Sequence, residues 1–204
     1  MPAPGAGTAE IVARYDRPMQ SSRTLVVLVT GAPGSGKTIL SRRLAEDLGC
    51  ALLSKDAFKE RLAEDEGVPR TVAESNRLGA RAYAALFAEA GEAADARGRV
   101  VVESNFRRGR SERELAVLVA RVEARVVHCT ATRARIEARY RGRGTARHPV
   151  HLDALRIGDV LRELDAGAYE PLRLDVPTLR VRTDHGYWPA YREVLAFASR
   201  GAGG

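Results

Sequence analysis

Residues 25–44 read LVVLVTGAPGSGKTILSRRL, and this stretch decides the fold. Residues 25–30 are almost wholly apolar, which predicts a strand buried on both faces of a parallel sheet. Residues 31–38 then match the pattern G-x-x-x-x-G-K-[ST], and an amphipathic helix over 36–48 is expected to follow. Glycines in such a turn let successive backbone N–H groups face one concavity, where phosphate oxygens bind at the helix N-terminus. The sequence therefore predicts a phosphate-binding loop between a buried strand and a helix.

Each residue of this loop has an expected part in holding a nucleoside triphosphate. We expect Lys37 to reach the β- and γ-phosphates and the Thr38 hydroxyl to ligate Mg²⁺. An ordinary glycine-rich turn is disfavoured because the strand, the Lys-Thr pair and the helix are all present. The loop alone does not separate kinases from ATPases, GTPases or motor proteins. The expected ATP-binding residues are Gly31, Ala32, Pro33, Gly34, Ser35, Gly36, Lys37 and Thr38.

Composition limits what kind of protein this is. The chain has 204 residues, of which 45% are hydrophobic and 29% charged, a balance typical of a globular domain. No apolar run is long enough to cross a membrane, and the two cysteines exclude a disulfide framework and favour a reducing cytoplasm. The net charge of +7 comes mostly from arginines spread along the chain. This distribution favours a generally solvated surface over a binding site for long nucleic acid, which stays an alternative.

The chain reads as one domain with alternating strands and helices, which predicts an α/β fold with a parallel sheet and crossover helices. Residues 1–22 are expected to form a flexible N-terminal arm, and 23–200 the single domain. Gly98 is expected to end the long helix. The expected strands are Leu25–Thr30, Ala51–Ser54, Val100–Glu103, Arg125–Cys129 and Leu179–Arg182, and the expected helices are 36–48, 56–64, 72–97, 111–123, 132–141, 152–165 and 187–199.

Two acidic residues follow strands that flank the phosphate loop. Asp56 comes just after strand 51–54, where a carboxylate can face the γ-phosphate and act as catalytic base; the alternative is a helix N-cap. Glu103 ends strand 100–103, where it can hold the Mg²⁺ shell through water or orient the substrate hydroxyl, or else satisfy nearby loop amides. Lys59, Asn105 and Arg107 are expected to contact the substrate.

An arginine-rich segment over about 135–155 predicts a helical lid. Arg135, Arg139 and Arg143 recur at four-residue spacing and run into a glycine-containing basic loop. Such guanidinium groups can close on a transferring phosphoryl group and exclude water. Arg135 and Arg139 are expected to bind ATP, and Arg139 and Arg143 to act in catalysis; a solvated helix is the alternative. His148 and His151 lack further ligands and do not make a metal site.

The chain resembles P-loop kinases, and within them the small AAA-type "predicted kinase" family that includes chloramphenicol phosphotransferase-like and polynucleotide 5′-kinase-like enzymes. The resemblance covers about residues 24–184 and rests on the phosphate loop, on Ser54-Lys55-Asp56, on residues 102–106 and on the basic segment through residues 147–149. It implies a three-layer P-loop NTPase fold with sheet order 2-3-1-4-5. It also implies Asp56 as the base, Lys59 as a matching basic residue, and adenine resting on the lid base and on residues 183–186.

These observations together predict an ATP- and Mg²⁺-dependent cytoplasmic kinase that phosphorylates a hydroxyl group of a small molecule. The expected acceptor is an antibiotic, a nucleoside or a sugar nucleotide. Two alternatives stay open: a polynucleotide 5′-hydroxyl kinase, and a non-catalytic ATP-binding switch or toxin-like module. Asp56 favours an enzyme, because a switch needs no carboxylate facing the γ-phosphate.

Overall fold

The computed structural model describes residues 24–96, 98–142 and 147–200. The expected N-terminal arm over residues 1–22 and Arg143 therefore lie outside the described residues. The strands are β1 (Leu25–Gly31), β2 (Ala51–Ser54), β3 (Arg99–Glu103), β4 (Glu123–Thr130) and β5 (Thr178–Arg182). They pair in parallel in the order β2-β3-β1-β4-β5, so the expected sheet order is confirmed.

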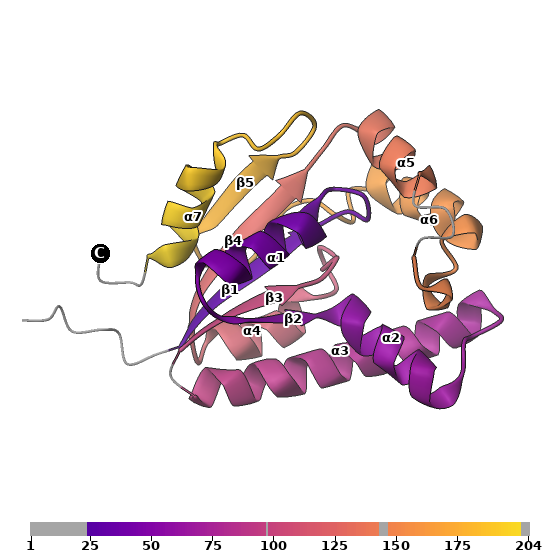
Figure 1. The fold of residues 1–204 in the computed structure, drawn as a ribbon, viewed down its shortest axis with the longest axis horizontal. Coiled ribbons are helices and arrows are strands. Elements are labelled where there is room, and N and C mark those ends of the chain that lie inside the picture. Colours follow the sequence, from indigo (N-terminus) through magenta and orange to yellow (C-terminus); the bar gives the residue numbers. More distant parts are fainter. Residues whose placement is uncertain (1–23, 97, 143–146, 201–204) are drawn as a thin grey trace, which may run out of the picture.

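Helices cover both faces of this sheet because alternate strand residues point to opposite sides. Val26 and Leu28 of β1 pack toward α3 and α4, while Val27 and Val29 pack toward α1 and α7. The result is a three-layer α/β structure, with α3 along one side of the sheet and α1 and α7 on the other (Figure 1). The helices are α1 (Lys37–Asp47), α2 (Lys55–Glu66), α3 (Val72–Asp95), α4 (Glu112–Val119), α5 (Arg133–Arg141), α6 (Asp153–Asp165) and α7 (Tyr191–Ser199), and a 3₁₀ turn η2 spans Pro149–His151.

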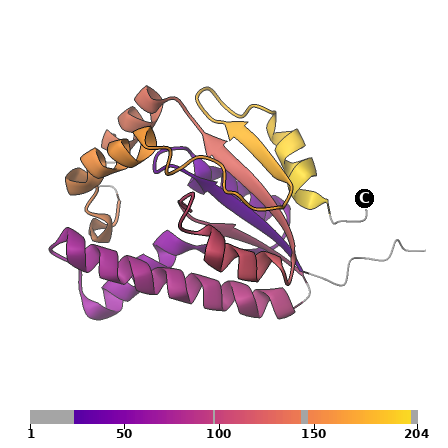
Figure 2. The same ribbon diagram turned by 180° about the vertical axis from the view of Figure 1, so that it is seen from behind.

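All five strands are parallel, so their carboxyl ends meet at one edge of the sheet, where ligands of such folds bind. The phosphate loop follows β1, the central strand, and α2 follows β2 directly. Helices α5 and α6 lie together beyond this edge, facing α2 and the first turns of α3 (Figures 1 and 2). The edge is therefore enclosed by helices on two sides.

Two expected element boundaries are wrong, and each has a local cause. The helix expected over 111–123 ends at Val119, because Val122 packs into the core and Glu123 already joins β4, donating its N–H to Thr24 at 2.9 Å. The helix expected from 187 begins at Tyr191. Trp188 instead exchanges two backbone hydrogen bonds with Arg182 at 2.8 and 3.0 Å, which holds it in an extended bridge.

Candidate active site

A cavity of about 1740 Å³ lies at the carboxyl ends of the strands. The phosphate loop and the start of α1 line one part of it, and α2, α3 and α6 line the other. Sites for single ligands usually measure about 300–1,000 Å³, so this volume leaves room for a nucleotide and a second molecule together. A direct transfer between two bound molecules requires such a shared space.

The phosphate loop has the backbone conformation that the sequence predicts. Gly34 and Gly36 adopt φ values of 90° and 81°, which favour glycine, and α1 begins directly after them at Lys37. A Cβ on Gly34 would lie 2.8 Å from the Ile136 carbonyl oxygen, because α5 packs against the loop there. Ser35 Oγ is buried and has no hydrogen-bond partner among the described residues. Pro33, Gly34, Gly36, Lys37 and Thr38 line the cavity, whereas Gly31, Ala32 and Ser35 form the buried base of the loop.

The Lys37 ammonium is buried between the loop and the end of β3. Its Nζ lies 3.8 Å from Glu103 Oε1, and the other oxygen of this carboxylate accepts a hydrogen bond from the Ser54 hydroxyl at 2.6 Å. Glu103 is 1% exposed and does not line the cavity, so the structure gives no support to its expected contact with the substrate. It lies behind the loop, beside the cation that is expected to reach the phosphates.

The donor set at this point fits Mg²⁺. The Thr38 hydroxyl and the Glu103 carboxylate are hard oxygen donors, and Mg²⁺ typically takes only one or two protein ligands and completes its shell with water and phosphate oxygens. Within the described ranges, no group of three or more His, Cys, Asp or Glu side chains is arranged to hold a metal ion. This small number of protein ligands agrees with a metal ion that is held mainly by bound phosphates.

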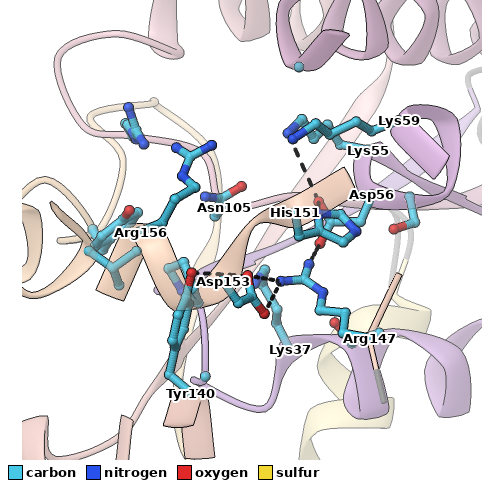
Figure 3. Close-up of a pocket in the computed structure, with 18 of the residues that line it drawn as sticks. Lys37, Lys55, Asp56, Lys59, Asn105, Tyr140, Arg147, His151, Asp153 and Arg156 are labelled. Atoms are coloured by element: carbon cyan, nitrogen blue, oxygen red, sulfur yellow. Dashed lines mark hydrogen bonds and ion pairs between the residues drawn. The ribbon is translucent and has the colours of Figure 1, made fainter. Parts of the chain in front are cut away.

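Asp56 lies in the first turn of α2, but it does not cap that helix. Ser54 occupies the N-cap position, and the Asp56 carboxylate instead accepts a hydrogen bond from the Arg147 guanidinium (Figure 3). Lys55 Nζ is 3.9 Å from Asp56 Oδ1. Burial alone would raise the pKa of Asp56, yet Arg147 and Lys55 outweigh burial and hold this pKa well below its usual range. The carboxylate is therefore ionised at neutral pH and lines the same cavity as Lys37.

Arg147 joins Asp56 to the segment expected to form the lid. Its Nη1 donates to both oxygens of Asp153, at 3.0 and 3.1 Å, and Asp153 Oδ1 also accepts from the Tyr140 hydroxyl at 3.0 Å. Figure 3 shows this chain running from Tyr140 through Asp153 and Arg147 to Asp56. The candidate base is thus held by residues that come 84–97 positions later in the sequence.

Lys59 and His151 are buried side chains near Asp56. Lys59 is 2% exposed, and its ammonium donates to Ser75 Oγ at 2.5 Å and to the Val150 carbonyl at 3.2 Å. Burial and neighbouring cations lower the Lys59 pKa to about 7. His151 Nε2 lies 2.7 Å from Glu60 Oε1, and burial lowers the His151 pKa to about 4. Lys59 therefore ties α2 to α3 and η2 in this structure, and its contact with a substrate stays a prediction.

The lid arginines occupy different places. Arg139 donates to the Gly34 carbonyl at 3.3 Å and to Thr183 Oγ1 at 2.9 Å, so it bridges the phosphate loop and the loop after β5. Arg135 is exposed and does not line the cavity. Of the other expected contacts, Asn105 lines the cavity, and Arg107 lines it while paired with Glu163 at 2.9 Å.

Sequence reasoning did not assign three residues of this cavity. The sequence places Arg147 only in the basic segment of the expected lid and Lys55 only in the motif Ser54-Lys55-Asp56, and it gives Arg156 no role. A signal for Arg156 exists, because residues 153, 156 and 160 recur at helical spacing and all line the cavity. No such signal pairs Arg147 with Asp56, since the contact joins residues 91 positions apart.

No helix in the described part of the chain is both long and apolar enough to span a membrane. Residues 26–166 match the AAA_33 family, an AAA domain. A presumed kinase from Chloroflexus aurantiacus J-10-fl superimposes with a TM-score of 0.75; the two chains are 31% identical, and the match covers 85% of this chain and 95% of that one. A shikimate kinase of Thermobifida fusca (strain YX) is 58% identical over 43 residues, which span 21% of this chain and 24% of that enzyme.

Two further solved structures share the fold at lower identity. A gluconokinase from Sinorhizobium meliloti 1021 has a TM-score of 0.53 and 22% identity, over 86% of this chain and 91% of that one. The APS kinase of Mycobacterium tuberculosis, solved with AMPPNP and APS, has a TM-score of 0.56 and 18% identity, over 87% and 99% of the two chains.

Proposed function

The chain belongs to the AAA_33 family of AAA domains, and from that premise we propose that it is an ATP- and Mg²⁺-dependent phosphotransferase. In this proposal it transfers the γ-phosphoryl group of ATP to a hydroxyl group of a small molecule. One observation carries the proposal: the phosphate loop with Lys37 and the ionised Asp56 line a single cavity with room for two molecules. The similar proteins that are named as kinases of shikimate and APS, and as a gluconokinase, support it.

Phosphoryl transfer asks the protein mainly for positioning and for charge stabilisation. The loop N–H groups and Lys37 hold the phosphates, and Arg139 lies beside Gly34 and Gly36, where its guanidinium can stabilise charge on the transferred group. Mg²⁺, when bound, neutralises phosphate charge. Thr38 would hold it directly, and Glu103 would hold it through its water shell.

Asp56 orients the acceptor hydroxyl in this mechanism. Its low pKa keeps the carboxylate ready to accept a hydrogen bond, but it also makes Asp56 a weak proton acceptor while Arg147 stays bound to it. A loose transition state needs little proton transfer before the phosphoryl group has moved. Positioning of the hydroxyl is therefore the larger part of the Asp56 contribution, and the proton passes to it late.

An acceptor screen tests the proposal. The wild-type protein is incubated with Mg-ATP and a pool of small metabolites, and products that have gained one phosphate are identified by mass. ATP turnover should stay near background until an acceptor is added. Lys37→Met, which keeps the length of the side chain, controls for contaminating kinases. Acceptor-independent ATP turnover, or no product from any pool, would contradict the proposal.

A second arm of the same screen addresses the polynucleotide alternative. A 5′-hydroxyl oligonucleotide is offered under identical conditions, and its labelling would assign a polynucleotide kinase instead. The finer acceptor class of antibiotic, nucleoside or sugar nucleotide stays a prediction that the identity of the product decides.

A further inference from the structure

The part of the cavity between α2, α3 and α6 holds more positive charge than its carboxylates balance. Two of its arginines are neutralised locally: Arg147 by Asp56 and Asp153, and Arg107 by Glu163. Within the described residues, Lys55 has only a long ion pair with Asp56, at 3.9 Å, and Arg156 has none. These two cations, contributed by different helices, line the same end of the cavity as Asp56.

Among the residues that the structure describes, none accepts a hydrogen bond from the Lys55 ammonium. The Lys55 side chain is 13% exposed, and within the described residues its nearest carboxylate oxygen is Asp56 Oδ1, at 3.9 Å, while the other oxygen of that carboxylate accepts from Arg147. The ammonium lies 5.4 Å from the centroid of the Tyr83 ring. It also lies 3.5 Å from the point where a Cβ on Gly79 would stand, so the glycine leaves room for it.

Arg156 reaches the same region from α6. Its Nη1 donates to the side-chain oxygen of Asn76 on α3 at 3.1 Å, which orients the guanidinium without neutralising it. In the described part of the chain, no carboxylate forms an ion pair with Arg156. In the view of Figure 3, Arg156 and Lys55 approach from opposite sides, with Asn105 between them.

The two cations influence each other electrostatically. Burial lowers the pKa of Lys55, Asp56 partly offsets this, and Arg156, Arg147 and Arg107 lower the pKa further. Such an arrangement is costly for an empty cavity because like charges face each other in a partly desolvated space. An anion placed between them removes that repulsion and gains charge-assisted hydrogen bonds.

We propose that Lys55 and Arg156 form an anion-binding subsite for the phosphate acceptor, so that the acceptor carries a carboxylate or a phosphate group in addition to its hydroxyl. Lys55 Nζ lies 3.9 Å from Asp56 Oδ1, so the anionic group and the hydroxyl that is phosphorylated belong to one small molecule and lie a few bonds apart. This inference rests on the proposed function. It favours acidic acceptors such as sugar nucleotides over neutral antibiotics and nucleosides.

The chain offers a direct reporter, because its three lysines are Lys37, Lys55 and Lys59. Protein labelled with ¹³C at the lysine ε-carbons gives three signals, and Lys55→Met assigns the one of interest. The phosphate loop is first filled with AMPPNP and Mg²⁺, which the Lys37 signal reports. Acetate, inorganic phosphate and the neutral analogue acetamide are then titrated separately at neutral pH.

Acetate or phosphate should shift the Lys55 signal with saturation, while acetamide should not. A response to acetate assigns a carboxylate acceptor, and a response to phosphate assigns a phosphorylated one. Arg156→Gln should weaken this binding about tenfold, the size expected for losing one hydrogen bond to a charged group. Arg133→Gln, on the neighbouring helix α5, is the matched control, because Arg133 is exposed, pairs with Asp165 and does not line the cavity, and it should leave binding unchanged.

Three results would overturn the subsite: no anion shifts Lys55, acetamide shifts it equally, or Arg156→Gln binds as the wild type does. Failure of the proposed function has a different signature, because AMPPNP would then leave the Lys37 signal unmoved. Anion binding at the phosphate loop is also recognised, since it shifts Lys37 rather than Lys55.

Discussion

Replacing Asp56 by asparagine tests the proposed chemistry most directly. The side chain keeps its size, and its amide oxygen can still accept from Arg147, which also keeps its bonds to Asp153. Among the described residues, no hydrogen bond or ion pair joins Asp56 to the phosphate loop, so ATP affinity should change little or rise as a negative charge leaves the cavity. Phosphoryl transfer should fall by about two to four orders of magnitude, because a neutral amide both orients the acceptor hydroxyl less strongly than a carboxylate does and cannot take up its proton late in the transfer. That loss corresponds to about 2.7–5.4 kcal/mol of barrier height.

The stability cost of the same change is small and can be worked from the structure. Arg147 and Asp56 are 24% and 29% exposed, so losing the charge of this ion pair costs about 1–2 kcal/mol. Losing a negative charge in the first turn of α2 adds about 0.3–1 kcal/mol. At about 2–4 °C per kcal/mol for a domain of this size, the melting temperature should fall by about 3–12 °C. Thermal unfolding checks that the variant is folded at the assay temperature.

The assay combines an ATP-binding titration, acceptor phosphorylation and thermal unfolding of one preparation. Asp165→Asn is the matched control, because Asp165 is an exposed aspartate of α6 that pairs with Arg133 and does not line the cavity. It should change neither turnover nor ATP affinity. Transfer by Asp56→Asn within about fivefold of the wild type, with normal ATP binding, would refute the role assigned to Asp56, since typical losses are at least a hundredfold.

Three further perturbations follow from the site. Lys37→Met should reduce phosphoryl transfer by at least about a thousandfold, because it removes the cation at the phosphates. Isotopic transfer assays measure this loss, and activity near that of the wild type would refute the assignment of the phosphate loop. Gly34→Ala should weaken ATP binding and lower the melting temperature, because φ of this residue is 90° and the new Cβ would lie 2.8 Å from the Ile136 carbonyl oxygen. Gly158→Ala, in α6, is the control, and its effect on the melting temperature should be neutral or slightly stabilising. Arg147→Met should reduce stability in a pH-dependent way. The Asp56 pKa lies below its unfolded value of about 3.9, so the ion pair stabilises the fold above that pH and loses its contribution as pH falls through the folded pKa. Urea unfolding should therefore show a constant gap between wild type and variant from about pH 7 to 5 that narrows below about pH 4; a gap that persists at low pH would contradict the ion-pair explanation.

The sequence alone determined the sheet and the phosphate loop. A continuous apolar run such as Leu25–Gly31 buries both of its faces only when helices cover both sides of the sheet. The spacing of Gly34, Gly36 and Lys37 belongs to one turn, so the local sequence is enough to predict it. The resemblance to P-loop kinases supplied the strand order, which the structure confirms. The place of Asp56 just after strand 51–54 predicts a carboxylate near the phosphates, and Asp56 does line the cavity, although its role stays a prediction.

Local patterns were least informative where a loop pairs with a distant strand. Trp188 follows a turn and precedes a helix, so its neighbours favour an early helix start. Its backbone bonds to Arg182 hold it extended instead, and α7 begins only at Tyr191.

Only the tertiary structure decided what surrounds Asp56. A charged side chain selects its partner by distance in space, and neither periodicity nor spacing records a contact between residues 91 positions apart. The fold therefore determined that Arg147 holds Asp56 and that Glu103 turns toward Lys37 and Ser54 rather than into the cavity. It also brought Lys55 and Arg156 to one end of the cavity. Helix α2 packs against α3, and Arg156 of α6 donates a hydrogen bond to Asn76 of α3. The motif predicts where phosphate binds, and the packing of distant helices determines which charges face the proposed acceptor.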